Sequence, residues 1–252
     1  MQKINGIANE YEFVRYLNKR RVCKLNPIFR ELFEKLFGEV NENDVIKSWK
    51  NPYKQKADFY IKIGENVKRI SLKVGVKNSV HTEPISEFVH FLIENKVDRE
   101  TVLKFLHYHY ADGSTNGKGC KRLSVEEYKK TYQKNIDEVN EIFNNELLLC
   151  KAIDRFVISG RNSKNAIDAI IHGVLNDFIW ITKDDITKII MSKKDEYSTA
   201  LHFGCLTCQP LCRCLNYNPK HEKSRFCVQI KWYNMVDDII ENMNNNLINN
   251  TK

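Results

Sequence analysis

The sequence predicts a single mixed α/β domain in which a central mixed β-sheet is flanked by helices. Apolar residues recur at helical spacing near the amino terminus, and the period falls from about 3.6 to about 2 between residues 57 and 76. Short strand-like segments follow beyond residue 150. We find no internal repeat and no linker rich in Pro, Gly or Ser, so residues 1–252 are interpreted as one domain.

The amino-terminal part combines predicted helices with one hairpin. The first helix covers residues 6–21, and the second begins at Asn26-Pro27 and ends at Gly38, residue types favoured at a helix start and stop. The hairpin is expected at residues 57–76. Two further helices are predicted at residues 85–94 and 98–107.

The rest of the chain is predicted to alternate between loops, helices and strands. Residues 112–120 form a loop by composition, and Ser124 with Glu127 is a capping-box pattern that begins a long helix. A short helix is expected after Thr182 and a final one after Asp237. The predicted strands cover residues 156–159, 168–172, 178–181, 200–206 and 225–232.

Composition narrows the class of partner and the compartment. The formal net charge of +8 favours a polyanionic partner, of which nucleic acid is the commonest. The chain has no apolar run of 18 residues and no apolar stretch at its amino terminus, so we expect no membrane span, no export and a cytoplasmic location. The eight cysteines are then expected to be reduced thiols.

The predicted hairpin gathers polar side chains on one face. Its two-residue turn, Gly64-Glu65, has glycine first, as in a type II′ turn. The register that this turn imposes sets Asp58 opposite Ser71 and places Lys73 diagonally adjacent to Asp58. Alternation alone is also compatible with an ordinary amphipathic hairpin whose charged face is solvated.

Such a face suits phosphodiester hydrolysis. The Asp58 carboxylate can hold a divalent cation that polarises a phosphate and lowers the pKa of bound water. The Lys73 amine can orient or deprotonate that water and offset the developing negative charge.

The segment from Asp58 to Lys73 resembles the core of the PD-(D/E)XK nucleases, in which an aspartate on one strand is followed by acid-x-lysine on the next. Here Ala57 stands in place of the proline and Ser71 in place of the second acid. The latter departure resembles the subgroup of type II restriction endonucleases that reads Ser-x-Lys and takes its missing acid from a later helix. The resemblance covers about residues 1–95 and implies a restriction-endonuclease-like core, Mg²⁺ as cofactor and double-stranded DNA as substrate.

The subgroup's spacing points to the missing acid. Its helix-borne glutamate follows the lysine after thirteen intervening residues, and the same spacing after Lys73 leads to Glu87. Because Glu87 lies opposite the apolar stripe of its predicted helix, it could also be a solvated side chain, and Glu83 is the fallback ligand. An amino-terminal helix of the subgroup lends a further glutamate, for which Glu10 is the matching candidate, ahead of Glu12.

Two other constellations compete with this site. The sequence Gln229-x-Lys231 is a second variant of acid-x-lysine, and a rival active site could pair it with Asp168 or Asp177. The thiols of a cysteine cluster are numerous enough for a tetrahedral zinc site, but their spacing differs from two Cys-x-x-Cys pairs, so metal-free thiols are favoured. The cluster comprises Cys205, Cys208, Cys212 and Cys214.

The second half of the chain is expected to complete the sheet and to recognise the target. Residues 209–225 form a loop rich in arginine and amide side chains, which contact phosphates or read base edges. The candidate DNA contacts are Arg213, Asn216, Asn218, Lys220 and Arg225.

Together with the residue patterns, this resemblance implies a site-specific type II restriction endonuclease, and we expect it to act as a homodimer, since symmetric cutting of a duplex needs two active sites. Residues 1–110 would form its catalytic half and residues 111–252 its recognition half. Asp58 and Glu87 would hold magnesium, and the implied catalytic set is Asp58, Ser71, Lys73, Glu87 and Glu10. The alternatives are a non-catalytic DNA-binding module with a zinc-held cysteine cluster, and a repair or junction-resolving nuclease of the same fold.

Overall fold

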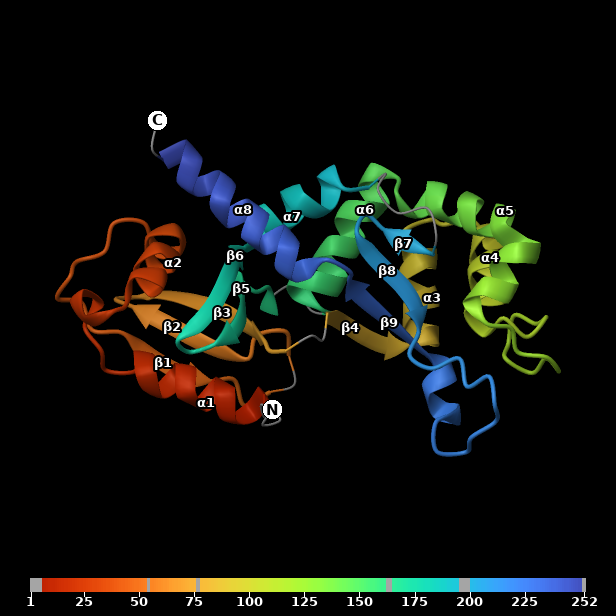
Figure 1. The fold of residues 1–252 in the computed structure, drawn as a ribbon, viewed down its shortest axis with the longest axis horizontal. Helices are drawn as coiled ribbons and strands as arrows, with labels where there is room; N and C mark the ends of the chain where they lie inside the picture. Colours follow the sequence, from red (N-terminus) through yellow and green to blue (C-terminus); the bar gives the residue numbers. More distant parts are fainter. Residues whose placement is uncertain (1–5, 54, 76–77, 162–164, 195–199, 251–252) are drawn as a thin grey trace. The chain divides into compact units, whose positions relative to one another are not determined.

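The computed structural model describes residues 6–53, 55–75, 78–161, 165–194 and 200–250. The chain divides into two compact units (Figure 1). Unit 1 comprises Met1–Lys77, Val157–Ile189 and Asn234–Lys252, and unit 2 comprises Asn78–Phe156 and Ile190–Tyr233. The chain therefore passes between the units several times, and the units do not coincide with residues 1–110 and 111–252.

Unit 1 is built on a five-stranded sheet of order β1-β2-β3-β5-β6. Strands β1, β2 and β3 are antiparallel, β3 and β5 are parallel, and β5 and β6 are antiparallel, so the sheet is mixed, as the sequence predicts. The strands are β1 Lys47–Lys50, β2 Phe59–Ile63, β3 Asn66–Lys73, β5 Ala169–Val174 and β6 Asp177–Thr182.

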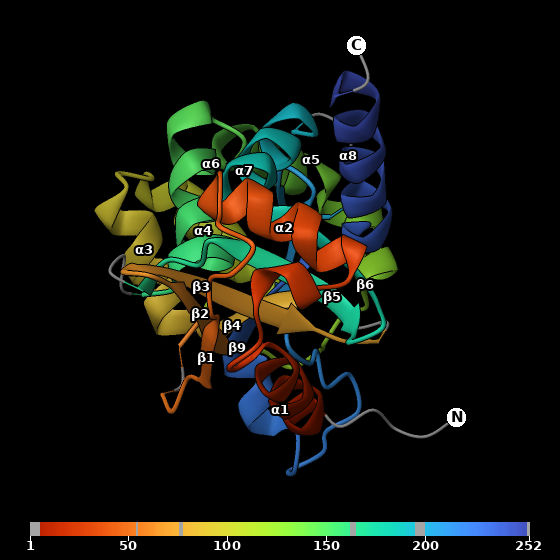
Figure 2. The same ribbon diagram turned by 90° about the vertical axis from the view of Figure 1, so that its left-hand side faces the viewer.

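The helices of unit 1 are α1 Gly6–Leu17, α2 Pro27–Phe37 and α8 Met235–Asn250, together with α7 Lys183–Ser192 as far as Ile189. Figure 2 shows α1, α2 and the strands of this unit from a second side. The start of α2 is as predicted, because the Asn26 side chain accepts a hydrogen bond from the Phe29 N–H at 2.9 Å. One core joins α1, α2 and the sheet, and Phe13, Phe29 and Phe178 meet ring to ring within it.

Unit 2 contains an antiparallel sheet of order β4-β9-β8-β7. Its long helix begins with the predicted capping box of Ser124 and Glu127. The strands are β4 Ser79–Pro84, β7 His202–Phe203, β8 Leu206–Pro210 and β9 Cys227–Trp232. The helices are α3 Ile85–Glu94, α4 Arg99–Tyr110, α5 Val125–Phe143 and α6 Glu146–Ile153. Among the described residues, no helix combines the length and the apolar composition needed to cross a membrane.

Two predicted strands are wrong or incomplete. The segment 156–159 is not a strand but the end of a π-helical turn, Asp154–Ser159, that continues α6. Its side chains are buried on all sides, and a short apolar run of this kind has no period that separates strand from helix. The segment 200–206 belongs to the hairpin of β7 and β8. The sequence analysis does not predict strands β1 and β4, because most of their residues are polar and they lack a clear run of alternating apolar side chains.

Candidate active site

The β2–β3 hairpin has the predicted register. Gly64 has a φ of 55°, and Ile63 pairs with Asn66 across the turn. At the other end of the hairpin the Asp58 N–H donates to the Ile70 carbonyl at 2.8 Å, so Asp58 directly precedes β2 with its backbone in the sheet. This register brings Asp58 beside Ser71.

The Asp58 carboxylate is held by two donors from β3. The Ser71 hydroxyl donates to Oδ2 at 3.2 Å, and the Leu72 N–H donates to the same oxygen at 2.6 Å. Burial raises the pKa of Asp58, and the charge of Lys73 and the Leu72 hydrogen bond offset only part of that rise. Asp58, Ser71 and Lys73 therefore form one interacting group, as the hairpin register predicts.

An acid from α1 joins this group. The negative charge of Glu10 also raises the pKa of Asp58, which puts the two carboxylates within electrostatic reach of each other. Glu10 is paired with Lys50 at the end of β1, with 2.7 Å between Lys50 Nζ and Glu10 Oε2. Lys50 is a residue that the sequence analysis missed, and only the pairing of β1 with β2 reveals it.

The neighbouring strand β5 adds a second residue that was missed. His172 is the register partner of Lys73 in the parallel pair β3–β5. Its Nε2 lies 3.0 Å from the Gly75 carbonyl oxygen, and burial lowers its pKa. The pairing spans about a hundred residues of chain, and parallel pairings of this range have no local sequence signal.

The loop between β1 and β2 is fixed directly before Asp58. Asn51 is buried, its N–H donates to the Asp58 carbonyl at 2.9 Å, and its side-chain amide donates to the Ala57 carbonyl at 2.8 Å. The loop exposes Tyr53 to solvent. This arrangement holds the backbone of Asp58 from the side opposite β3.

Glu87 and its fallback Glu83 both belong to unit 2, Glu87 on α3 and Glu83 on β4. Glu87 lies in the first turn of α3 and is half-buried. Glu83 is buried, and its Oε2 lies 3.2 Å from His81 Nε2 and 2.9 Å from an Arg155 guanidinium nitrogen. Burial alone would raise the pKa of Glu83, but these partners outweigh it and the pKa is lowered. Glu83 thus has a structural role that makes it a poor fallback ligand, whereas Glu87 stays a prediction.

The candidate DNA contacts fall into two groups. Arg225 is only 2% exposed, and its guanidinium lies 3.1 Å from Asp112 and 3.2 Å from Glu222. Its positive charge is paired with these two carboxylates inside unit 2, so we no longer count Arg225 among the candidate DNA contacts. Arg213 packs over the Tyr108 ring and donates to the Tyr108 carbonyl at 3.0 Å. The exposed candidates are Asn216, Asn218 and Lys220.

The two competing constellations gain no support. Cys205, Cys208 and Cys214 are buried. Within the part of the chain that the structure describes, no group of three or more His, Cys, Asp or Glu side chains could hold a metal. Gln229 lies on β9 of unit 2 and donates to the Ser79 hydroxyl at 3.2 Å. Asp168 and Asp177 belong to unit 1, where Asp168 accepts a hydrogen bond from the Arg69 N–H at 2.7 Å.

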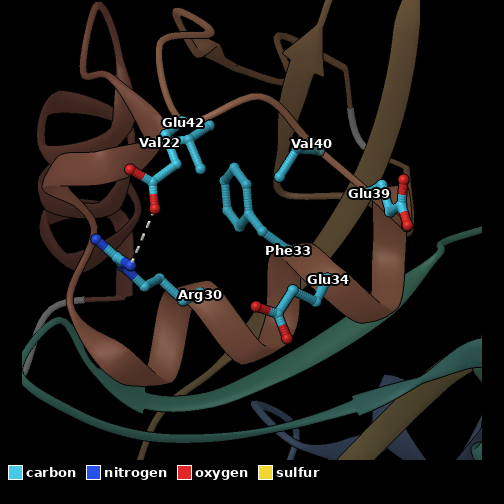
Figure 3. Close-up of a pocket in the computed structure, with 8 residues that line it drawn as sticks. Val22, Arg30, Phe33, Glu34, Glu39, Val40 and Glu42 are labelled. Atoms are coloured by element: carbon cyan, nitrogen blue, oxygen red, sulfur yellow. Dashed lines mark ion pairs between the residues drawn. The ribbon is translucent and has the colours of Figure 1, made fainter.

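A separate pocket of about 540 Å³ lies in unit 1 (Figure 3). Phe33 and Val40 give it apolar walls, and Arg30 forms an ion pair with Glu42 at 3.8 Å. The remaining charged side chains that line it are Glu34 and Glu39. An acidic lining repels phosphate, so this pocket is no part of a DNA-binding surface.

Comparison with known proteins identifies the fold. The sequence matches no protein-family model and no curated protein. Among solved structures, the chain is similar to the restriction endonuclease MspI, which was crystallised in complex with its cognate DNA. The TM-score is 0.58 at 11% sequence identity, and the match covers 90% of this chain and 88% of that chain. This chain has a restriction-endonuclease-like fold. The predicted fold class is confirmed.

Proposed function

We propose that this chain is a type II restriction endonuclease that uses Mg²⁺ to hydrolyse phosphodiester bonds in double-stranded DNA. The observation that carries the proposal is the half-buried Asp58 carboxylate, held by Ser71 and Leu72, whose raised pKa reflects both partial burial and the charge of Glu10, with Lys73 as its cationic neighbour. The group lies on a hairpin in a fold shared with a DNA-bound restriction endonuclease.

The residues present fit a magnesium ion. Mg²⁺ in nucleic-acid enzymes is bound through one or two carboxylates, substrate phosphates and water. Asp58 and Glu10 supply two carboxylates, and Ser71 and Leu72 both donate to Oδ2 of Asp58, so among the described residues Oδ1 stays available for coordination. Glu87 keeps the part of a further acid only as an expectation from the Ser-x-Lys resemblance, which Glu87→Gln tests. When bound, the cation would polarise the scissile phosphate and lower the pKa of a bound water.

Each protein group then has a defined task. The Lys73 ammonium would orient the attacking water and offset charge on the phosphate. Ser71 would fix the orientation of the Asp58 carboxylate through their hydrogen bond. Lys50 balances the negative charge of Glu10 in the metal-free protein, and a bound cation would take over that role.

Recognition of the target is proposed for unit 2. Asn216, Asn218 and Lys220 are exposed on one loop, and such side chains read base edges or contact phosphates. The net charge of +8 favours association with DNA. A homodimer would supply the second active site that cutting of both strands needs.

The test is incubation of plasmid DNA with purified protein and MgCl₂, with EDTA and ZnCl₂ as parallel conditions. We expect discrete fragments only with magnesium, and sequencing of their ends should show one recurring sequence. Sequence-independent ends, or a preference for branched duplexes, would replace restriction by a repair or junction-resolving activity. Stoichiometric zinc with DNA binding and no cutting would support a non-catalytic module instead.

A further inference from the structure

His172 stands next to the proposed catalytic lysine on the neighbouring strand. Strands β3 and β5 are parallel, with Lys73 and His172 as register partners. Register partners in a sheet project their side chains from the same face. His172 therefore lies on the same face of the sheet as Lys73, next to the end of β3, where Lys73 is the last residue.

The imidazole also fixes the chain just beyond Lys73. His172 Nε2 lies 3.0 Å from the carbonyl oxygen of Gly75, two residues past the end of β3. A carbonyl oxygen only accepts, so the hydrogen must be on Nε2. Burial, and secondarily the charge of Lys73, lowers the pKa of His172, so the ring is neutral at neutral pH. The bond ties the segment after Lys73 to β5, and Gly75 has a φ of 70° that turns the chain there.

The strand that carries His172 is itself anchored. The Gly173 carbonyl accepts a hydrogen bond from the Asn9 side-chain amide of α1 at 3.0 Å. Gly173 has a φ of 134°, and a Cβ there would lie 2.3 Å from the Asp177 carbonyl oxygen. The position thus requires glycine, and the end of β5 is clamped between α1 and β6. His172 therefore lies on an anchored strand end and can restrain the segment around Gly75, to which it is hydrogen-bonded.

We infer that His172 is a positioning residue for Lys73, fixing the end of β3 through the Gly75 carbonyl so that the Lys73 ammonium is presented to the scissile phosphate. The inference rests on the proposed nuclease function. It does not make His172 a catalytic residue, because the ring acts through the backbone that follows Lys73. Loss of the bond should leave DNA binding intact and slow the chemical step.

The test uses three variants of His172. His172→Leu removes the donor, His172→Asn is too short to reach Gly75, and His172→Gln places an amide N–H where Nε2 is now. His90→Leu, at an exposed histidine on α3, is the matched control. Two quantities are measured: the single-turnover cleavage rate at saturating protein, and amide hydrogen exchange of a peptide covering residues 71–75, which needs no DNA. Duplex affinity without magnesium and the melting temperature are recorded alongside.

We expect the Leu and Asn variants to cleave about 10- to 100-fold more slowly with unchanged duplex affinity, because small misplacement of a reacting group has effects of this size. Exchange at residues 71–75 should accelerate in both, and Gln should restore rate and protection. Wild-type behaviour of the Leu and Asn variants, failure of Gln to restore either quantity, or unfolding of both loss variants would overturn the inference. If wild-type protein cleaves no DNA, the nuclease proposal fails separately, and exchange alone decides whether His172 positions Lys73.

Discussion

At the scale of single residues, the negative charge that Asp58 needs to bind a cation also destabilises the metal-free fold. The Asp58 carboxylate is half-buried, and its raised pKa means that the fold disfavours its charged form. Ser71 and Leu72 nevertheless hold it in one orientation. A cation would remove this conflict, which is the behaviour expected of a metal ligand in a metal-free protein.

Asp58→Asn should abolish magnesium-dependent cleavage and raise the melting temperature of the metal-free protein at pH 7. The amide oxygen can still accept from Ser71 and Leu72, while the half-buried negative charge is gone. Because the folded-state pKa of Asp58 is raised, its destabilising effect is complete above that pKa and vanishes below the ordinary value of 3.8. Differential scanning fluorimetry should therefore show a gain that shrinks as pH falls toward 3.8. A lower melting temperature than wild type at pH 7 would contradict this, with the exposed Asp177→Asn as control.

Glu83 and Glu87 should separate stability from activity. Glu83→Gln removes a buried charge that pairs with the half-buried Arg155 and His81, so the free energy of unfolding should fall by about 3 kcal/mol. Since the pKa of Glu83 is lowered, this loss is present above the ordinary pKa of 4.5 and narrows as pH falls below it. Glu87→Gln should leave unfolding unchanged and reduce cleavage as strongly as Asp58→Asn. Chemical denaturation measures the change in stability, and plasmid cleavage measures the change in activity. If Glu83→Gln and Glu87→Gln both cleave nearly as fast as wild type, a helix-borne acid is rejected.

At the scale of elements, predictability follows the range of the interactions. The β2–β3 hairpin could be predicted because Gly64 and the alternation around it are local, and this register places Asp58, Ser71 and Lys73 together. The contributions of Lys50 and His172 could not, because they depend on strand pairings set by the whole core. The burial of single side chains could not be predicted from the sequence either, and burial is the reason why Arg225 is not a candidate DNA contact.

The two loops of unit 2 that contain residues 112–120 and 209–225 are joined by an ion pair, and this gives a prediction at the same scale. Arg225→Ala leaves the Asp112 carboxylate buried without its partner, so unfolding should become easier by about 3–5 kcal/mol. Lys220→Ala, at an exposed position of the same loop, should leave stability unchanged. It should instead flatten the salt dependence of duplex binding by about one unit if Lys220 contacts a phosphate. Thermal melts and binding at several salt concentrations separate these roles, and a stable Arg225→Ala protein with weakened DNA binding would return Arg225 to the DNA surface.

At the scale of the whole molecule, the architecture persists where the sequence does not. The chain shares its fold with MspI at 11% identity over 90% of its length. Asp58, Lys73 and Glu10 belong to unit 1, whereas Glu87 and the loop that exposes Asn216, Asn218 and Lys220 belong to unit 2. The nuclease proposal therefore concerns the complete chain.

Single-turnover cleavage by Lys73→Ala, compared with Lys68→Ala, tests the nuclease proposal most directly. Both lysines lie on β3, but Lys68 is a register partner of the buried Ile61 and pairs with Asp168 rather than with the Asp58 group. We predict that Lys73→Ala slows cleavage by about 10²- to 10⁴-fold while duplex binding persists, and that Lys68→Ala cleaves like wild type. Cleavage at the wild-type rate by Lys73→Ala would contradict the assignment of the active site to the β2–β3 hairpin.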